Sequence, residues 1–377
     1  MKQSANSSLL WHSALLATVS GELAGQNWSQ AAQASVEELG LVMGTHPGLK
    51  RERNEDRVAA ARVRALNGEL YTVAVLCDGV GGSQSGDRAA ECAIASVVVH
   101  LAGQRYRPGL KELATALVKV ADSHVRDAFA GRGATTLVLL VATSTGLLVC
   151  ASVGDSRAYR WDAGGGSALE QVTVDDTIEN ELKNLPGDHA ALLKERGLQG
   201  RLSQAIGEEG RSVDELRVQV YTRERFANGV VLGSDGLWRA AQDFSSVASI
   251  ATSPTDLVRR VLNLANWVGG VDNASVVAIE DINRFCGPLN QPHASSPASE
   301  HWIVLWTPLL KVKIMTDIWL SDASLASKTG PSRVKRKVTK PTSAGTSSGK
   351  KQLSLETSAI EQARPKLEVT LVDVQKK

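Results

Sequence analysis

The 377-residue sequence has few aromatic side chains and almost no net charge. Phe, Trp and Tyr make up 4% of the chain, whereas hydrophobic residues make up 43%. The core must therefore be built mainly from aliphatic side chains. Lys and Arg (42) nearly balance Asp and Glu (40), giving a formal net charge of +2. This balance argues against a globally basic nucleic-acid-binding protein.

Cysteine is also scarce, and no two cysteines form a Cys-x-x-Cys pair. The four are Cys77, Cys92, Cys150 and Cys286, of which Cys77 and Cys150 lie inside apolar runs. Such a pattern indicates reduced, structural cysteines in a cytoplasmic protein. It predicts neither a disulfide framework nor a zinc site.

Long hydrophobic runs are missing as well. A membrane-spanning helix needs about 18–20 apolar residues. The best stretch, "HWIVLWTPLLKVKIMTDIWL" at 301–320, is interrupted by Pro308, Lys311, Lys313 and Asp317. The sequence therefore predicts no membrane span. Near the start, "SSLLWHSALLATV" favours a short amphipathic helix over a weak secretory signal.

The composition divides the chain into three regions. Residues 1–36 are predicted to be an N-terminal extension, helical or partly ordered, and residues 37–283 to be the main domain. Residues 284–377 are predicted to be a basic, largely disordered tail with a short strand at its end. Seven basic residues and no acidic ones lie between 331 and 351. We interpret this basic segment as a solvated linker, and contact with nucleic acid or anionic lipid is the alternative.

The main domain alternates between groups of strands and groups of helices. Strand-like runs such as "LYTVAVLCD" are joined by tight turns, including "NGE" at 67–69, which is a hairpin signal. Helical periodicity covers about 87–102, 110–129 and 254–267. This order predicts an α+β protein with antiparallel sheets and paired helices, not a doubly wound fold.

Acidic residues recur where strands begin or end. Asp78 and Asp235 follow apolar runs, Asp272 precedes one, and Glu55-Asp56 stands before another. If these strand ends meet, several carboxylates share a small space, and two charges about 4 Å apart repel by roughly 4 kcal/mol at moderate dielectric. Hard divalent cations such as Mg²⁺ or Mn²⁺ would compensate this repulsion. The alternative for each single acid is an ordinary turn residue, because Asp-Gly is a common turn dipeptide.

Four glycines lie within the eight residues that follow Asp78. Gly79, Gly81 and Gly82 remove the side chains that would keep a backbone carbonyl from a cation. The spacing matches neither a P-loop nor a dinucleotide-binding fingerprint nor a nucleophile elbow. The glycines therefore favour the metal-site interpretation.

Seven segments together resemble a known family, the metal-dependent type 2C (PPM-type) Ser/Thr protein phosphatases in their bacterial form. In order they are "RERNEDR", "VLCDGVGG", "GATTLV", "VGDSRAYRW", "LSQAIG", "LGSDGLW" and "VDNASVV", spread over residues 37–283. The resemblance implies that 37–283 is a PPM-type catalytic domain. Its fold would be a four-layer α-β-β-α sandwich of two antiparallel sheets flanked by helix pairs.

The resemblance also implies a centre of two Mn²⁺ or Mg²⁺ ions. Asp78 would bridge the ions and Gly79 would offer its carbonyl oxygen. Asp235 and Asp272 would hold one ion, and Glu55 or Asp56 the other, directly or through water. Arg51 falls where the family places its phosphate-binding arginine, and the alternative for Arg51 is a solvated surface charge.

The implied activity is that of a protein-serine/threonine phosphatase, a phosphoric monoester hydrolase. A metal-bridging water or hydroxide would attack phosphoserine or phosphothreonine while Arg51 clamps the phosphate. The implied partner is a phosphoprotein, either a Ser/Thr kinase or its targets. The alternative is a non-catalytic regulatory module of the same fold that binds a signalling partner.

Some positions have a structural interpretation or depart from the family pattern. Thr135 and Thr136 suit a central strand, and Asp155 in "VGDS" is predicted to be a turn residue rather than a ligand. Some members carry a histidine where this chain has Val80. Many carry an aspartate two or three residues before the glycine of "GATT", where this chain has Ala130 and Gly131, so a third metal site in that arrangement is not expected.

Overall fold

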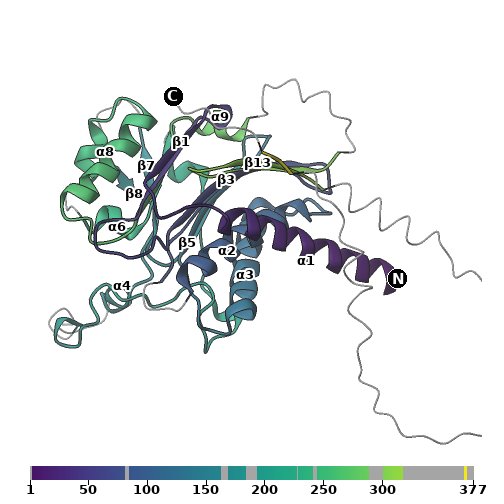
Figure 1. The fold of residues 1–377 in the computed structure, drawn as a ribbon, viewed down its shortest axis with the longest axis horizontal. Helices are drawn as coiled ribbons and strands as arrows, with labels where there is room; N and C mark the ends of the chain where they lie inside the picture. The colour runs from purple at the N-terminus through teal and green to yellow at the C-terminus, as the bar shows by residue number, and fades with distance from the viewer. Residues whose placement is uncertain are drawn as a thin grey trace, which may run out of the picture.

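The computed structural model describes residues 2–80, 85–162, 169–183, 193–226, 228–240, 244–287, 300–316 and 369–371. Two antiparallel sheets form its centre (Figure 1). The six-stranded sheet has the order β1-β2-β11-β10-β7-β8, and the eight-stranded sheet has the order β14-β13-β12-β3-β4-β5-β6-β9. Gly81, Gly82 and the basic segment 331–351 lie outside the described residues.

The strands are short, and most of them are buried. Their bounds are β1 Ala32–Val36, β2 Leu41–His46, β3 Arg57–Arg64, β4 Leu70–Cys77, β5 Leu137–Thr143, β6 Leu148–Val153, β7 Arg157–Trp161, β8 Glu170–Gln171, β9 Gln219–Thr222, β10 Gly229–Gly233, β11 Ala274–Ile279, β12 Trp302–Trp306, β13 Lys311–Met315 and β14 Val369–Leu371.

Helices cover the outer faces of both sheets. Their bounds are α1 Lys2–Ala24, α2 Gly86–Ala102, α3 Leu110–Phe129, α4 Ile178–Leu182, α6 Asp235–Trp238, α7 Phe244–Ser249, α8 Pro254–Trp267 and α9 Ile282–Cys286, with 3-10 turns η1 Glu37–Leu39, η2 Val213–Glu215 and η3 Arg223–Arg225. Within the described residues, no helix has both the length and the apolar character needed to cross a bilayer.

Three apolar layers separate the four structural layers. One lies between helices α1, α2 and α3 and the eight-stranded sheet, one between the two sheets, and one between the six-stranded sheet and α8. The alternation of side chains along each strand produces this arrangement. On β4, Val73 and Val75 face the helices, whereas Ala74 and Leu76 face the other sheet. The predicted α+β sandwich is confirmed.

The hairpin signal at 67–69 is also confirmed. β3 and β4 pair in antiparallel register from Arg57 opposite Cys77 to Arg64 opposite Leu70. Gly68 adopts a φ of 77°, a left-handed conformation that glycine reaches without steric cost. Its N–H donates to the carbonyl of Ala65 at 2.8 Å, which closes the turn.

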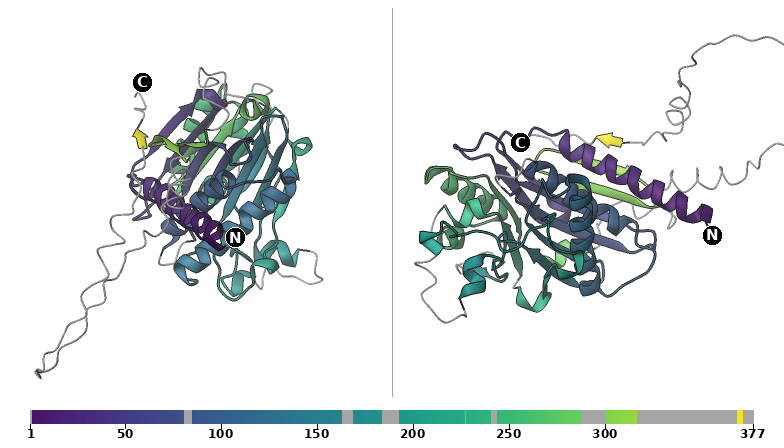
Figure 2. Two further views of the ribbon diagram at one scale, coloured as in Figure 1. Left: turned by 90° about the vertical axis from the view of Figure 1, so that its right-hand side faces the viewer. Right: turned by 90° about the horizontal axis from the view of Figure 1, so that it is seen from below.

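Both ends of the chain differ from the predicted boundaries, because each contributes to the main fold. α1 packs on α2, and its buried Leu15 and Val19 share one apolar cluster with Ile303 and Ile314 of the C-terminal strands. Figure 2 shows α1 alongside these strands, and Trp11 Nε1 donates to the carbonyl of Thr316 at 3.4 Å.

The C-terminal strands extend the eight-stranded sheet beyond the predicted boundary at residue 283. β12 pairs with β3, β13 pairs with β12, and the three-residue β14 pairs with β13. The sequence "KVKIM" alternates between charged and apolar residues, so Val312 and Ile314 are buried while Lys311 and Lys313 are less so. The two lysines lie over the rings of Trp306 and Trp302. Apolar burial on one face thus orders a segment that was predicted to belong to the tail.

Candidate metal centre and phosphate site

The strand register gathers five aspartates at one end of the sandwich. Asp56 and Asp78 adjoin Arg57 and Cys77, which pair across β3 and β4. Across the other sheet, Gly233 pairs with both Val276 of β11 and Arg157 of β7. Asp235, Asp272 and Asp155 all lie within four residues of these pairs. Residues from five separate segments therefore lie close together, because the strands that they adjoin end at the same end of the sandwich.

Asp78 lies at the centre of this acidic group. Burial raises the pKa of its carboxyl well above the usual range, and the negative charges of Asp56, Asp235, Asp155 and Asp272 raise it further, in that order. Such a pKa means that the protein stabilises the ionised carboxylate poorly in the absence of a nearby cation.

Thr135 and Thr136 hold the backbone at Asp78. The Asp78 N–H donates to Thr136 Oγ1 at 3.0 Å, and the Asp78 carbonyl accepts from Thr135 Oγ1 at 2.9 Å and from the Thr136 N–H at 2.8 Å. At the next residue, Gly79, a Cβ would lie 2.5 Å from the carbonyl carbon of Gly86. Only glycine fits there, so the chain can turn closely past Asp78.

Asp56 is completely buried. Its Oδ2 accepts a hydrogen bond from Ser234 Oγ at 2.8 Å, whereas its Oδ1 has no hydrogen-bond partner. Burial raises the pKa of Asp56 to about 7, and the charges of Asp235 and Asp272 add to the effect. A buried carboxylate oxygen without a partner is costly, which makes Asp56 a candidate for cation binding.

Glu55 lies on the more exposed side of the same loop. Its N–H donates to Asn273 Oδ1 at 2.8 Å, and its carbonyl accepts from the Gly79 N–H at 3.2 Å. Burial, followed by the charge of Asp87, raises the pKa of the Glu55 carboxyl. The sequence predicted the two acids as interchangeable, but the structure separates them, with Asp56 inside and Glu55 toward the surface.

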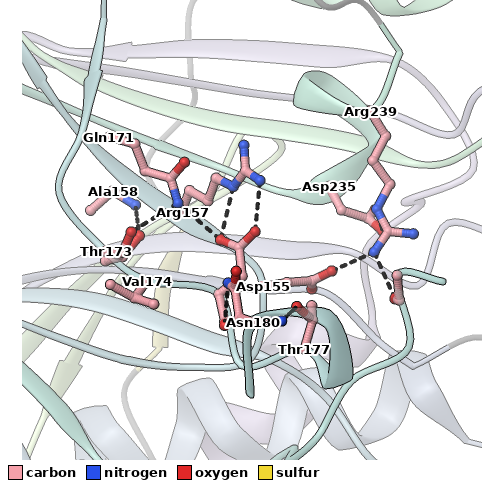
Figure 3. Close-up of polar contacts among 12 residues, drawn as sticks. Asp155, Arg157, Ala158, Gln171, Thr173, Val174, Thr177, Asn180, Asp235 and Arg239 are labelled. Carbon is pink, nitrogen blue, oxygen red and sulfur yellow. Dashed lines mark hydrogen bonds and ion pairs between the residues drawn. The ribbon is translucent and has the colours of Figure 1, made fainter. Parts of the chain in front are cut away.

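Arg239 is a member of the site that sequence reasoning missed. Its Nη2 donates to Asp155 Oδ2 at 2.6 Å and its Nε lies 3.1 Å from Asp235 Oδ2 (Figure 3). Asp155 stands in the predicted turn, but its carboxylate is buried and ion-paired, which the prediction of a turn residue did not include. The pKa of Asp155 is raised to about 7. Burial is the largest cause and the charge of Asp235 is the next, whereas the charge of Arg239 lowers the pKa.

Arg51 and Asp272 form the exposed margin of the site. Arg51 Nη2 donates to Asp272 Oδ2 at 2.7 Å, and the Arg51 side chain keeps 41% of its surface exposed. This hydrogen bond raises the pKa of Arg51, so the guanidinium is charged at every ordinary pH. An accessible guanidinium with unused donors can bind a phosphate.

A polar pocket of about 450 Å³ adjoins Arg239. Arg157 (Figure 3) donates to Asp175 through two hydrogen bonds of 2.9 and 2.6 Å. Its guanidinium carbon lies 3.5 Å from the ring centre of Trp238. Thr177 and Asn180 line the same pocket. These contacts fasten the segment after β8 to the acidic end of the sandwich.

The carboxylate oxygens at this site are suitable ligands for hard divalent cations, although the side chains are not arranged in a complete coordination geometry. Over the described residues, no three His, Cys, Asp or Glu side chains are arranged as a metal site. Two of the carboxylates are engaged by arginine instead, Asp272 by Arg51 and Asp235 by Arg239. The unpartnered Asp56 oxygen and the crowded carboxylates are what Mg²⁺ or Mn²⁺ would compensate.

No family model matches the chain. Among solved structures it is similar to the PPM Ser-Thr phosphatase MsPP from Mycobacterium smegmatis, with a TM-score of 0.51 and 25% identity over 66% of this chain and 99% of that one. It also resembles Ser/Thr phosphatase Stp1 from Staphylococcus aureus in fold, with a TM-score of 0.53 and 20% identity over 64% of this chain and 94% of that one.

Two curated relatives have similar sequences. The chain is 26% identical over 251 residues to "Serine/threonine phosphatase stp" of Listeria welshimeri, covering 63% of this chain and 93% of the relative. It is 24% identical over 248 residues to "Protein phosphatase PhpP" of Streptococcus pneumoniae, covering 62% and 94%. The predicted resemblance to PPM-type bacterial Ser/Thr phosphatases is confirmed. Both relatives are named as phosphatases, and the Listeria relative is named as a serine/threonine phosphatase, which is the predicted enzyme class.

Proposed function

We propose that this chain is an active, metal-dependent phosphatase that hydrolyses phosphoserine and phosphothreonine in proteins. The observation that carries the proposal is the convergence of Asp56, Asp78, Asp235 and Asp272 around a site where buried carboxylates lack enough positive charge. A purely structural site would have no need of this arrangement, since buried charges of one sign destabilise a fold.

Six residues are proposed to hold two Mn²⁺ or Mg²⁺ ions: Asp78, the Gly79 carbonyl, Asp235, Asp272, Glu55 and Asp56. When bound, such ions lower the pKa of the attacking water and neutralise charge on the phosphoryl oxygens. Of the glutamate–aspartate pair, Asp56 carries the unpartnered oxygen and is the better candidate for direct contact. Glu55, nearer the surface, suits a contact through water.

Arg51 is proposed to bind the substrate phosphate. In the structure it pairs with Asp272, so phosphate binding and cation binding are linked. A cation on Asp272 would compete with the guanidinium for that carboxylate, and the released guanidinium would turn to the phosphate. Arg239 has the same relation to Asp235, while its second contact to Asp155 keeps it at the site.

The proposed substrates are phosphoproteins, either a Ser/Thr kinase or its targets, and the proposed compartment is the cytoplasm. Cys77, Cys92, Cys150 and Cys286 are all free thiols, which suits a reducing compartment.

Phosphate release from a phosphothreonine peptide, measured with and without Mn²⁺, tests the proposal. Asp235→Asn should reduce turnover by at least about a hundredfold, since it removes a charged ligand of the proposed metal centre. Asp214→Asn is the matched control, because the Asp214 side chain is 97% exposed and forms a surface ion pair with Lys119. Absence of turnover by well-folded parent protein in excess Mn²⁺ would favour the non-catalytic regulatory module instead.

A further inference from the structure

Large apolar side chains are exposed beside Arg51. Eight such residues are exposed in the described part of the chain; three of them lie on the two loops that carry Arg51 and Asp272, and a fourth is the last residue of α8, which leads into the second loop. We call these four the apolar rim: Trp267 (83% exposed), Leu49 (64%), Val271 (60%) and Val268 (39%). Single exposed apolar residues are common, but three on two hydrogen-bonded loops and a fourth at the helix end that leads into one of them point to a binding surface.

The two loops are fixed to each other by hydrogen bonds. The Leu49 and Lys50 N–H groups both donate to the Gly270 carbonyl, at 2.7 and 3.2 Å. The Asn273 side-chain amide donates to the carbonyls of Pro47 at 2.7 Å and Arg53 at 2.9 Å. The apolar rim is therefore preorganised, and a ligand would spend little free energy on ordering it.

Close packing supports the same conclusion. A Cβ on Gly270 would lie 2.8 Å from Leu49 Cγ, so the leucine side chain rests directly on the opposite loop. At the end of α8, Asn266 Nδ2 lies 3.0 Å from His46 Nε2, which links the residue before Trp267 to the end of β2.

The apolar rim is continuous with the proposed phosphate site. Leu49 precedes Arg51 by two residues, Val271 immediately precedes Asp272, and the Arg51–Asp272 ion pair joins the loops. An extended peptide advances about 3.3 Å per residue, so the residues flanking a phosphorylated one lie within one or two side-chain lengths of the phosphate. A substrate anchored at Arg51 would thus place its neighbouring side chains against the apolar rim.

We infer that the apolar rim is a substrate-docking surface that favours phosphoproteins with a large apolar side chain next to the phosphorylated residue. The inference rests on the proposed function and adds a substrate preference to it. All four side chains of the rim are apolar, so an apolar side chain of the substrate gains by burial against them. The indole of Trp267 is the largest contact surface and is expected to carry most of the preference.

Two phosphothreonine peptides, identical except for Leu or Ser at the positions flanking phosphothreonine, test the inference. The parent protein should show a kcat/KM about tenfold higher for the Leu peptide, the factor expected from half-burying one such side chain. Trp267→Ala should abolish that preference and leave turnover of p-nitrophenyl phosphate unchanged. Tyr106→Ala is the matched control, because Tyr106 is also 83% exposed but belongs to the loop between α2 and α3.

Fluorescence anisotropy with the same two labelled peptides separates this inference from the proposed function. If the parent turns over no substrate, the proposed function fails, and the binding preference for the Leu peptide and its loss in Trp267→Ala still decide the role of the apolar rim. Equal kcat/KM values and equal binding of both peptides by the parent would overturn the inference. A concentration-dependent dimer that Trp267→Ala dissociates, with no peptide preference, would also overturn it and assign the apolar rim to a second copy of the chain.

Discussion

The acidic end of the sandwich and the face covered by α1 both bury titratable side chains, with different consequences. At the acidic end, Asp56, Asp78 and Asp155 are removed from water near one another, and burial raises each pKa. Arg239 and Arg51 compensate only part of the negative charge. This end therefore remains costly to the fold unless cations are supplied from outside.

The α1 face partly buries three histidines, one from each helix. His12 of α1 and His124 of α3 have ring centres 5.4 Å apart, and His100 of α2 lies near both. Burial lowers the pKa of all three, with mutual repulsion as a second cause for His12 and His100. Asp127 opposes the shift at His124.

The comparison teaches that burial favours the neutral form in both places. An imidazole is mostly neutral near pH 7 even in water, whereas a carboxyl becomes neutral there only if its pKa is raised by several units. His124 Nδ1 is satisfied by Ser96 Oγ at 2.9 Å, and the surrounding contacts are apolar. The α1 face therefore needs no added charge, whereas the acidic end is costly to the fold unless cations compensate its carboxylates. Mutations should accordingly separate activity from stability at the two regions.

The largest expected effect is the loss of activity in Asp78→Asn. Because Asp78 is central to the proposed metal centre, turnover with Mn²⁺ should fall by at least about a hundredfold. The same change removes a buried, poorly compensated charge, so the metal-free variant should unfold at a higher temperature than the metal-free parent. Phosphate release and thermal unfolding in EDTA measure the two outcomes. If Asp78→Asn kept the turnover of the parent, or unfolded at a lower temperature than the metal-free parent, the proposal that the acidic end is destabilising without cations would be contradicted.

At the α1 face, Leu15→Ala should lower the stability of the protein and leave its activity unchanged, the reverse of the effects expected for Asp78→Asn. Leu15 is fully buried between α1, α2 and the C-terminal strands, so truncation should lower the free energy of unfolding by about 2–5 kcal/mol. Turnover per folded molecule should remain that of the parent. Chemical denaturation and phosphate release measure these quantities, with the exposed Ser13→Ala as the control. A specific loss of turnover in folded Leu15→Ala would mean that α1 takes part in the site.

The smallest expected effects are on the pH dependence of stability, which the carboxylates and the histidines change in opposite directions. Asp56 and Asp155 have a pKa of about 7 in the folded protein and near 4 when unfolded, so the folded state binds more protons between these values. The stability of the metal-free protein should therefore fall as pH rises from 4 to about 7. The histidines act in the other direction, because their folded pKa lies below 6.5, and their contribution is lost as pH falls below that value.

Unfolding temperatures between pH 5 and 8, with and without Mn²⁺, separate the two contributions. Mn²⁺ should remove the pH dependence of the unfolding temperature that the carboxylates cause. The unfolding temperature should then still fall by a few degrees at acidic pH, because of the histidines. His124→Gln should reduce that remaining loss. An unchanged pH profile after Mn²⁺ addition would indicate that the carboxylates do not bind the cation.

Local patterns predicted much of the fold and part of the site. Asp78, Asp235 and Asp272 could be selected as candidates because acids at strand ends are visible in the sequence, and the structure places them at one end of the sandwich. Arg239 was missed, although its spacing of four residues from Asp235 on a short helical turn was an available signal. Asp155 was taken as a turn residue because a turn aspartate and a buried one have the same sequence signature. β12 and β13 were missed because Pro308 and the lysines hid an alternating strand pattern.

The sequence by itself determined which segments become strands and helices, since side-chain periodicity decides which face of each element is apolar. It also indicated the chemical type that we propose for the site, because carboxylates and glycines at strand ends limit the available chemistry. Only the tertiary structure decided which carboxylates are buried, which are held by arginine, and that the two ends of the chain pack together. These properties depend on contacts between residues far apart in the sequence, and they arise only when the strand register brings those residues together.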